Sequence, residues 1–258
     1  MYTGPNIVTT NLQLFYDFGN PACYPGTGTG LTNLISSNSG VGYLKNDVTF
    51  SSDFGGILRT GGTKAGGSGT NVVGDRIDIN TNGGSGIDRF SQTTSFTFVF
   101  WVRYISGGSN KIFSTGSSGS GNSDSCIWQF WVSSSQWYWW NSGGGGANAL
   151  TKAFPSTLST NVWYHLGFSY SYNESGTNYM RIYKDGDLWT TESIATATHS
   201  GVSRTTQTNL QYTLGGGYAG SCYTNNSQCD FGNFMCYNTA LSAAQMKQNY
   251  NGTKSRYL

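Results

Sequence analysis

The sequence predicts an all-β protein, a jelly-roll sandwich of two antiparallel sheets with one short helix near the C-terminus. Apolar and polar side chains alternate along many short segments, which is the period-two pattern of half-buried strands. The chain of 258 residues is 15% aromatic and contains 37 glycines. Aromatic residues favour strands and glycine favours turns, so this composition indicates many short strands joined by many turns.

The expected strands recur wherever this alternation holds. They cover residues 12–18, 76–79, 95–104, 111–114, 126–132, 136–140, 162–170, 178–183, 188–191, 212–215 and 232–237. Residues 95–104 alternate at their start and then become almost continuously apolar, as a central strand of a sandwich would. The dipeptide Asp185-Gly186 is a strong hairpin signal, so the strands on either side of it are expected to pair.

One helix is expected over residues 242–250. Ser242 is a typical N-cap residue, and Gln245 three positions later completes a capping-box pattern. Asn251-Gly252 is expected to end the helix, because glycine readily adopts the left-handed conformation of a helix C-terminus.

We expect a single domain over residues 1–258, with N-terminal strands and loops in 1–92 and the core sandwich in 93–258. The glycine- and serine-rich stretches are short and lie between strands that need partners, so they are expected to be loops. They cover residues 60–70, 115–125 and 141–147. The alternative is a boundary near residue 92 that separates a small N-terminal piece.

Charge excludes two classes of partner. Only 10% of the residues are charged and the formal net charge is +2. The basic residues are isolated from one another, so no patch for nucleic acid or for an anionic membrane is expected. Residues 1–15 lack the basic start and apolar run of a signal peptide, and no apolar stretch approaches the ~20 residues that span a bilayer. We expect synthesis in a host cytoplasm, followed by release within an assembled particle, or a mature form whose signal was removed.

The five cysteines are Cys23, Cys126, Cys222, Cys229 and Cys236. An odd number in a chain of this size is not a disulfide framework. A hairpin could bring Cys222 and Cys229 close enough to bridge, but cytoplasmic synthesis favours free thiols. Their spacing also lacks the CxxC pattern of zinc sites.

Four segments share a pattern with one known family. They are residues 95–102 (SFTFVFWV), 161–170 (NVWYHLGFSY), 180–186 (MRIYKDG) and 231–250 (FGNFMCYNTALSAAQMKQNY). In this order they resemble the laminin-G-like (LamG) branch of the concanavalin A-like lectin/glucanase superfamily, with Asp185 where that family usually has asparagine. The opening, residues 14–21 followed by 23–26, is similar to that of bacteriophage-encoded members. The resemblance implies two facing antiparallel sheets, in a superfamily that includes lectins, glycosidases and structural modules.

The carboxylates disfavour a glycosidase. Such enzymes need two carboxylates, and the glucanases of the superfamily carry theirs in an E-x-D-x-x-E pattern. This chain has two glutamates, Glu174 and Glu192, in or beside polar loops, and no E-x-D occurs. Asp75 and Asp78 flank an arginine without a glutamate partner, so they are expected at a solvated strand end.

Other catalytic arrangements are also missing from the sequence. His165 lies in an expected strand and is expected to be structural, and His199 lies in a Thr/Ser-rich loop without a signature. Neither a G-x-S-x-G nucleophile elbow nor a P-loop lysine is present. We expect no enzymatic activity and no catalytic residues.

No cofactor is expected, and calcium is the alternative, because many members of the resembled superfamily bind it at the sandwich rim. Calcium needs several converging oxygen ligands. The candidate rim carboxylates are Asp124, Asp185, Asp187 and Asp230, but no acidic cluster of the D-x-D-x-D-G kind occurs. Asp185-Gly186-Asp187 is more typical of a turn.

The strongest candidate site is aromatic. Five tryptophans and Tyr138 fall within residues 128–140. Aromatic rings stack on the apolar faces of sugars, so the candidate glycan-binding residues are Trp137, Tyr138, Trp139, Trp140 and Asn141. The alternative is that these rings fill the core. Because strand residues alternate in direction, Trp137 and Trp139 are expected on one face and Tyr138 and Trp140 on the other, with one pair facing away from the core.

We expect a non-catalytic protein on the virion surface of a tailed bacteriophage, either a capsid decoration protein or an external fibre component. Its expected partners are other virion proteins of the capsid or tail, further copies of itself in a homo-oligomer, and a host surface polysaccharide. The alternative is a glycan-binding adhesin or receptor-binding module, for which the aromatic segment is the reason. A glycoside hydrolase is a weaker third possibility.

Overall fold

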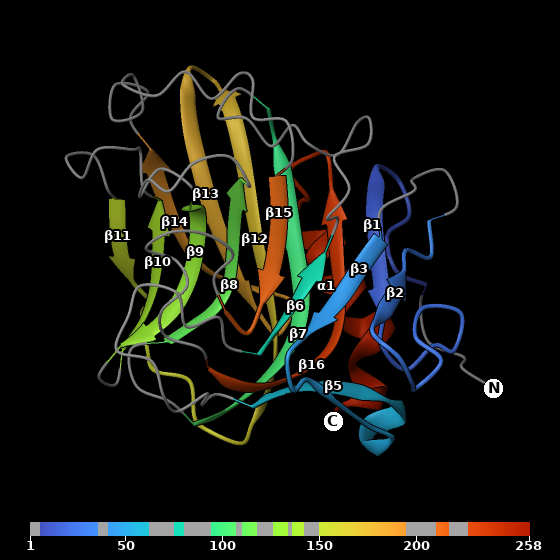
Figure 1. Ribbon diagram of the computed structural model, residues 1–258. Coiled ribbons are helices and arrows are strands. Elements are labelled where there is room, and N and C mark those ends of the chain that lie inside the picture. The colour runs from blue at the N-terminus through green and yellow to red at the C-terminus, as the bar shows by residue number, and fades with distance from the viewer. Residues whose placement is uncertain are drawn as a thin grey trace.

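Figure 1 shows the computed structural model of the protein. The structure describes residues 6–35, 41–61, 75–79, 94–106, 110–117, 126–133, 136–141, 150–194, 210–216 and 227–258. Of the sequence-based expectations, those for Asp124, His199 and Cys222 lie outside the described residues. Within the described part of the chain, no helix combines the length and the apolar character that crossing a membrane requires.

In the described part of the chain, the first sheet has eight strands. They are β1 (Leu12–Asp17), β4 (Thr49–Ser51), β5 (Ile57–Gly61), β7 (Phe96–Ser106), β12 (Trp163–Glu174), β13 (Thr177–Lys184), β14 (Asp187–Ile194) and β16 (Gln228–Tyr237). Their order is β14-β13-β12-β7-β16-β5-β4, and β1 also pairs with β16. The two central strands, β7 and β16, are the most deeply buried part of this sheet.

The second sheet, over the same described residues, also has eight strands. It lies in front of the first sheet in Figure 1. They are β2 (Gly30–Thr32), β3 (Val41–Lys45), β6 (Arg76–Ile79), β8 (Asn110–Ser117), β9 (Cys126–Ser133), β10 (Gln136–Asn141), β11 (Leu150–Ala153) and β15 (Leu210–Leu214). Their order is β11-β10-β9-β8-β15-β6-β3-β2. Neighbouring strands in both sheets are antiparallel, which confirms the predicted jelly-roll sandwich.

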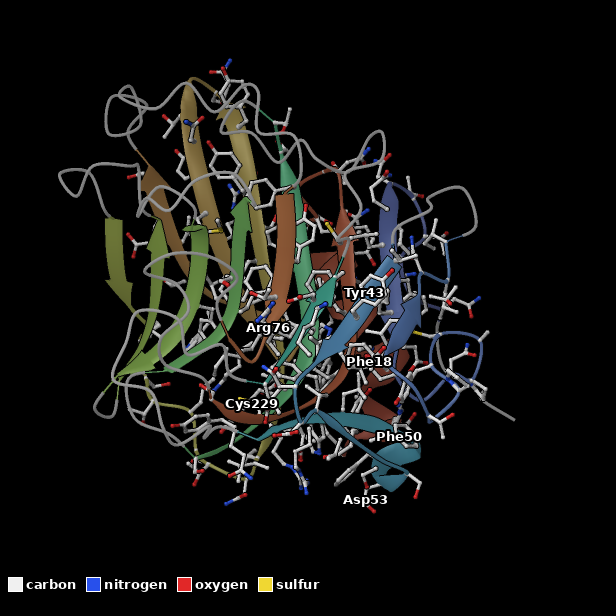
Figure 2. All side chains as sticks on the ribbon, in the orientation of Figure 1. Phe18, Tyr43, Phe50, Asp53, Arg76 and Cys229 are labelled. Carbon is white, nitrogen blue, oxygen red and sulfur yellow. The ribbon has the colours of Figure 1, made fainter. Side chains whose placement is uncertain are left out.

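The core between the sheets is built largely from phenylalanines. Phe98 and Phe100 on β7 meet Phe113 on β8, with ring centroids 5.0 and 5.7 Å apart, respectively. Phe130 on β9 lies 5.3 Å from Phe168 on β12. Full burial of such a side chain contributes about 1.5–3 kcal/mol, so these contacts are a main source of the attraction between the sheets. In Figure 2, Phe18 and Cys229 lie within the sandwich, and Phe50 and Asp53 lie at its lower end.

The outer face of the first sheet is covered by α1 (Ala243–Thr253), which ends in a short 3-10 turn, η5 (Lys254–Arg256). Met246 of α1 packs with Val99 of β7 in one apolar cluster. Trp101 stacks on Tyr257 at 4.6 Å and donates its indole N–H to Thr253 Oγ1 at 2.7 Å. This cover explains why residues 96–102 are buried on both faces of the strand.

The predicted helix start is confirmed, but its predicted end is wrong. The backbone N–H of Gln245 donates to Ser242 Oγ at 3.3 Å, and the Ser242 N–H donates to Gln245 Oε1 at 2.9 Å. The helix continues through Asn251 and Gly252 to Thr253. Gly252 is buried and does not have the positive φ of a glycine cap, so nothing in its conformation ends the helix there.

The predicted hairpin is confirmed. Lys184 pairs with Asp187 across a two-residue turn. Both turn residues have positive φ, 54° at Asp185 and 81° at Gly186, which is the geometry that matches the twist of paired strands.

The sequence patterns missed five strands, namely β2, β3, β4, β5 and β11. Each has only three to five residues. A segment this short carries too few residues for alternation to show, and its structure depends on a longer neighbour. Leu58 of β5, for example, pairs with Phe231 of β16, and β6 pairs with β15. Both sheets therefore combine strands from 1–92 with strands from 93–258.

Candidate functional site

The aromatic segment forms β10, which lies between β9 and β11 near one edge of the second sheet (Figure 1). Its register is fixed on both sides. Trp137 pairs with Val132, Tyr138 with Trp131, Trp139 with Phe130, Trp140 with Gln129, and Asn141 with Trp128. On the other side, Tyr138 pairs with Ala153 and Trp140 with Thr151.

This register assigns the positions of β10 to the two faces of the sheet. Phe130 belongs to the core between the sheets and is 1% exposed. Cross-strand partners share a face, so position 139 is on the inner face with Phe130. Strand residues alternate, so positions 137 and 141 are on the inner face as well, and positions 138 and 140 are on the outer face.

The outer face of the β9–β10 pair thus brings three aromatic positions together. Tyr138 and Trp131 are direct partners, and Trp140 is two residues further along the same strand. The neighbouring outer positions are Gln129 on β9 and Thr151 on β11, whose side-chain types can hydrogen-bond. We call positions 129, 131, 138, 140 and 151 the outer aromatic face. The described helix α1 lies on the other sheet, on the opposite side of the sandwich (Figure 1).

A ring stack joins the edge of this sheet to the other sheet. Phe154, just after β11, stacks on Trp189 of β14 with centroids 4.8 Å apart and planes 12° apart. Phe154 also meets Phe130 at 5.0 Å, and Lys184 Nζ lies 5.2 Å from the Trp189 ring. The strands of the outer aromatic face are therefore supported by the core behind them. Trp189 lies in an expected strand, but nothing in the local sequence marks it and Phe154 as partners across the sandwich.

Two of the carboxylates considered for catalysis, Glu174 and Asp78, form ion pairs with arginines. Glu174 binds Arg181 through two oxygen–nitrogen distances of 2.7 Å, and this hydrogen bonding lowers the pKa of Glu174. The expectation that Asp75 and Asp78 lie at a solvated strand end is wrong. Asp78 is 1% exposed and binds Arg76 Nε at 2.6 Å.

Asp75 is also buried, for a different reason. Its carboxylate accepts hydrogen bonds from the backbone N–H groups of Asp47 at 2.9 Å and Gly61 at 3.0 Å. Burial raises the pKa of the Asp78 carboxyl in spite of the neighbouring guanidinium of Arg76. Asp75 thus ties the segment around Asp47 to Gly61 of β5, and Asp78 pairs with Arg76 within β6.

The described candidates for calcium ligands are engaged elsewhere. Asp230 is fully buried and binds two arginines, so its expected place at the rim is wrong. Asp185 accepts the backbone N–H of His165 at 3.0 Å, and Asp187 binds Lys247 at 2.7 Å. Among the described residues, no group of three or more His, Cys, Asp or Glu side chains could hold a metal ion.

His165 is fully buried on the helix side of the first sheet. Its ring lies 5.2 Å from that of Trp101 and 5.8 Å from that of Tyr250. Within the described part of the chain, neither ring nitrogen has a hydrogen-bond partner, and burial lowers the pKa of His165 to about 3. The imidazole is therefore neutral and packs as a core ring.

The described cysteines Cys23, Cys229 and Cys236 are free thiols, and all three are buried. Burial raises the pKa of Cys23 to about 12 and raises the pKa of the other two well above the ordinary value. Their protonated, enclosed thiols are suited to packing, and not to nucleophilic chemistry.

Two facing antiparallel sheets with an outer helix define a lectin-like β-sandwich. Residues 73–247 match the model of the family described as the concanavalin A-like lectin/glucanases superfamily, and the chain belongs to this family. No curated protein matches the sequence.

Solved structures with the same fold include receptor-binding domains of toxins. The botulinum neurotoxin type G receptor-binding domain is 14% identical, with a TM-score of 0.59 over 93% of this chain and 51% of that one. A structure of botulinum neurotoxin type C, described as depending on interaction with two ganglioside molecules to enter cells, is 14% identical, with a TM-score of 0.63 over 95% and 51%. The binding domain of Paraclostridial Mosquitocidal Protein 1 is 14% identical, with a TM-score of 0.61 over 94% and 52%. The chain thus spans about half the length of these structures, and identities this low describe the fold alone.

Proposed function

We propose that the protein is a non-catalytic glycan-binding domain and that the outer aromatic face is its binding surface. The observation that carries the proposal is the register of β9 with β10, which places positions 131, 138 and 140 next to one another on the face turned away from the core. Aromatic residue types at three neighbouring positions suit the C–H faces of sugar rings. Gln129 and Thr151 beside them supply groups that hydrogen-bond to hydroxyls.

The structural neighbours support this class of ligand. The description of the type C neurotoxin names gangliosides, which carry sugars, and that protein contains the same kind of sandwich. The family of this chain has a lectin-like fold. Fold alone does not give function, so the proposal depends on the aromatic positions of β9 and β10.

A glycan-array screen of the purified protein tests the proposal. Wild-type protein is screened beside Tyr138→Ala and Trp140→Ala, which change outer positions. Tyr172→Ala is the matched control, because Tyr172 is an exposed aromatic residue (38%) on β12 of the other sheet. We expect binding to a defined set of glycans that both β10 variants lose and the control keeps. A folded wild-type protein that binds no glycan would overturn the proposal.

We also propose that the protein acts on the virion surface of a tailed phage, bound to capsid or tail proteins or to further copies of itself. The favouring observation is the opening segment, which resembles phage-encoded members. This segment is built into the fold: Cys23 and Tyr24 are 1% and 5% exposed, and the Tyr24 hydroxyl donates to the Gly28 carbonyl at 3.0 Å. Immunogold labelling of intact particles from a lysate tests the location. Labelled particle surfaces are expected, and unlabelled particles beside soluble protein would contradict it.

A further inference from the structure

We propose a second ligand site, separate from the outer aromatic face, in a cavity beneath the C-terminal segment. The structure assigns it to a small neutral molecule with adjacent hydroxyl groups, of about the size of one sugar ring. The cavity has a volume of about 280 Å³ and lies on the outer face of the first sheet. The function proposed for the outer aromatic face does not depend on this second site.

Four parts of the chain form the cavity. Phe15 and Asp17 come from β1, Asn233 from β16, Tyr257 from the segment after α1, and Ile7 from the segment before β1. Asp17 and Asn233 are register partners on neighbouring strands, so they lie side by side on the same face. Figure 1 shows the C-terminal end of the chain near β5 and α1, on this side of the molecule.

Two residues that line this cavity carry a buried polar atom without a partner among the described residues. Asn233 is 2% exposed, and its Oδ1 accepts no hydrogen bond. Tyr257 is 4% exposed, and its hydroxyl has no partner either. Burial raises the pKa of Tyr257, so the group stays a phenol that can donate. Buried polar groups are almost always paired, and two unpaired ones on residues that line a single cavity point to a missing partner.

The charged groups at the cavity neutralise each other. The guanidinium of Arg256 binds the carboxylate of Asp17 and the carbonyl of Gly56, and its Nε donates to the Phe54 carbonyl at 2.5 Å. Thr253 at the cavity is also occupied, because its Oγ1 accepts from Trp101 and donates to the Asn249 carbonyl at 2.8 Å. Among the described lining residues, no unpaired charge remains to select an anion or a cation.

The groups that remain match a hydroxylated ligand. Asn233 Oδ1 offers an acceptor and Tyr257 a hydroxyl, and neighbouring hydroxyls of one molecule can donate to the first and accept from the second. Phe15 and Ile7 supply apolar walls for C–H groups. The volume is several times the ≈30 Å³ of one water and close to the ~300 Å³ lower limit of small-molecule pockets.

Ligand-detected NMR by saturation transfer tests the proposal with defined probes. Neutral monosaccharides and polyols are compared with acetate, phosphate and ammonium. Tyr257→Phe removes one hydroxyl and keeps the ring, and Asn233→Leu replaces the amide by an apolar group of similar size. We expect at least one neutral sugar or polyol to bind the wild type and to lose about tenfold in affinity in Tyr257→Phe, the effect of one lost hydrogen bond.

Trp140→Ala separates this site from the outer aromatic face. We expect the probe that fills the cavity to bind Trp140→Ala as it binds the wild type. A neutral probe that no longer binds to Trp140→Ala but still binds to Tyr257→Phe would contradict the cavity site and support binding at the outer aromatic face. Equal binding to wild type and both cavity variants, preference for a charged probe, or no bound probe in a folded protein would each overturn it as well.

Discussion

The carboxylate of Asp230 on β16 binds the guanidinium of Arg103 on the neighbouring strand β7. The Oδ2 atom lies 2.9 Å from Nε and 2.5 Å from Nη2 of Arg103. On the other side of β16, Arg59 of β5 binds the same carboxylate through contacts of 2.6 and 3.0 Å. One fully buried aspartate therefore links three adjacent strands of the first sheet.

Replacing this aspartate should destabilise the protein strongly. Asp230→Ala leaves two guanidinium groups without their shared carboxylate, and breaking a buried pair costs about 3 kcal/mol or more in unfolding free energy. Asp187→Ala is the control, because it breaks an exposed pair with Lys247 and should cost under about 1 kcal/mol. Urea unfolding followed by tryptophan fluorescence measures both. Equal losses in the two variants would contradict the structural role of Asp230.

His165 should make the fold less stable in mild acid. Burial lowers its pKa to about 3, whereas a histidine in the unfolded chain titrates near ~6.5. As the pH falls, the histidine takes up a proton in the unfolded chain before it does so in the folded protein. The contribution of neutral His165 to the unfolding free energy is therefore fully present above about pH 6.5. It is lost as the pH falls towards 3, by at most ~1.4 kcal/mol per pH unit.

His165→Leu isolates this effect from the titration of carboxylates. Urea midpoints of the wild type and the variant are compared from pH 7.5 to pH 4.5. The wild type should lose more stability over this range than the variant, because only the wild type carries His165. Parallel pH profiles would show that His165 does not titrate differently in the folded and unfolded states.

The described cysteines should resist alkylation in the native protein. Cys23, Cys229 and Cys236 are enclosed, and burial raises the pKa of each thiol. Iodoacetamide followed by peptide mass spectrometry should therefore modify these three only after urea is added. Modification in native buffer at the rate seen in urea would rule out their burial.

The capping box of α1 should contribute measurably to stability. Ser242→Ala removes the hydroxyl that accepts the Gln245 N–H and should lower the unfolding free energy by about 1 kcal/mol. Ser242→Asn, which keeps a capping acceptor, should lose much less. Thermal unfolding measures the stability of both variants. Equal losses of stability would mean that the loss in Ser242→Ala does not come from the missing cap.

Long alternating segments were predictable from the sequence, and features that depend on remote neighbours were not. The alternation of β10 separates Trp139 from Trp140, but only its pairing with Phe130 tells which of them is on the core side. Asp230 could be taken for a rim ligand because nothing in the local sequence announces Arg59 and Arg103. The short strands β2 to β5 are defined by the neighbours they pair with.

The cavity beneath the C-terminal segment could not be foreseen for the same reason. Ile7 and Tyr257 are separated by nearly the whole chain, and folding brings them to one cavity. The extent of a single domain over 1–258 and the glycan-binding residues of β10 remain predictions from the sequence.

The most direct test of the account is calorimetric titration of the strongest array glycan into the wild type and into Trp131→Ala, Tyr138→Ala and Trp140→Ala. We predict that loss of any one outer ring weakens binding roughly tenfold. The control Tyr172→Ala should bind as the wild type does. Wild-type affinity in all three outer variants would contradict the claim that the outer aromatic face binds glycans.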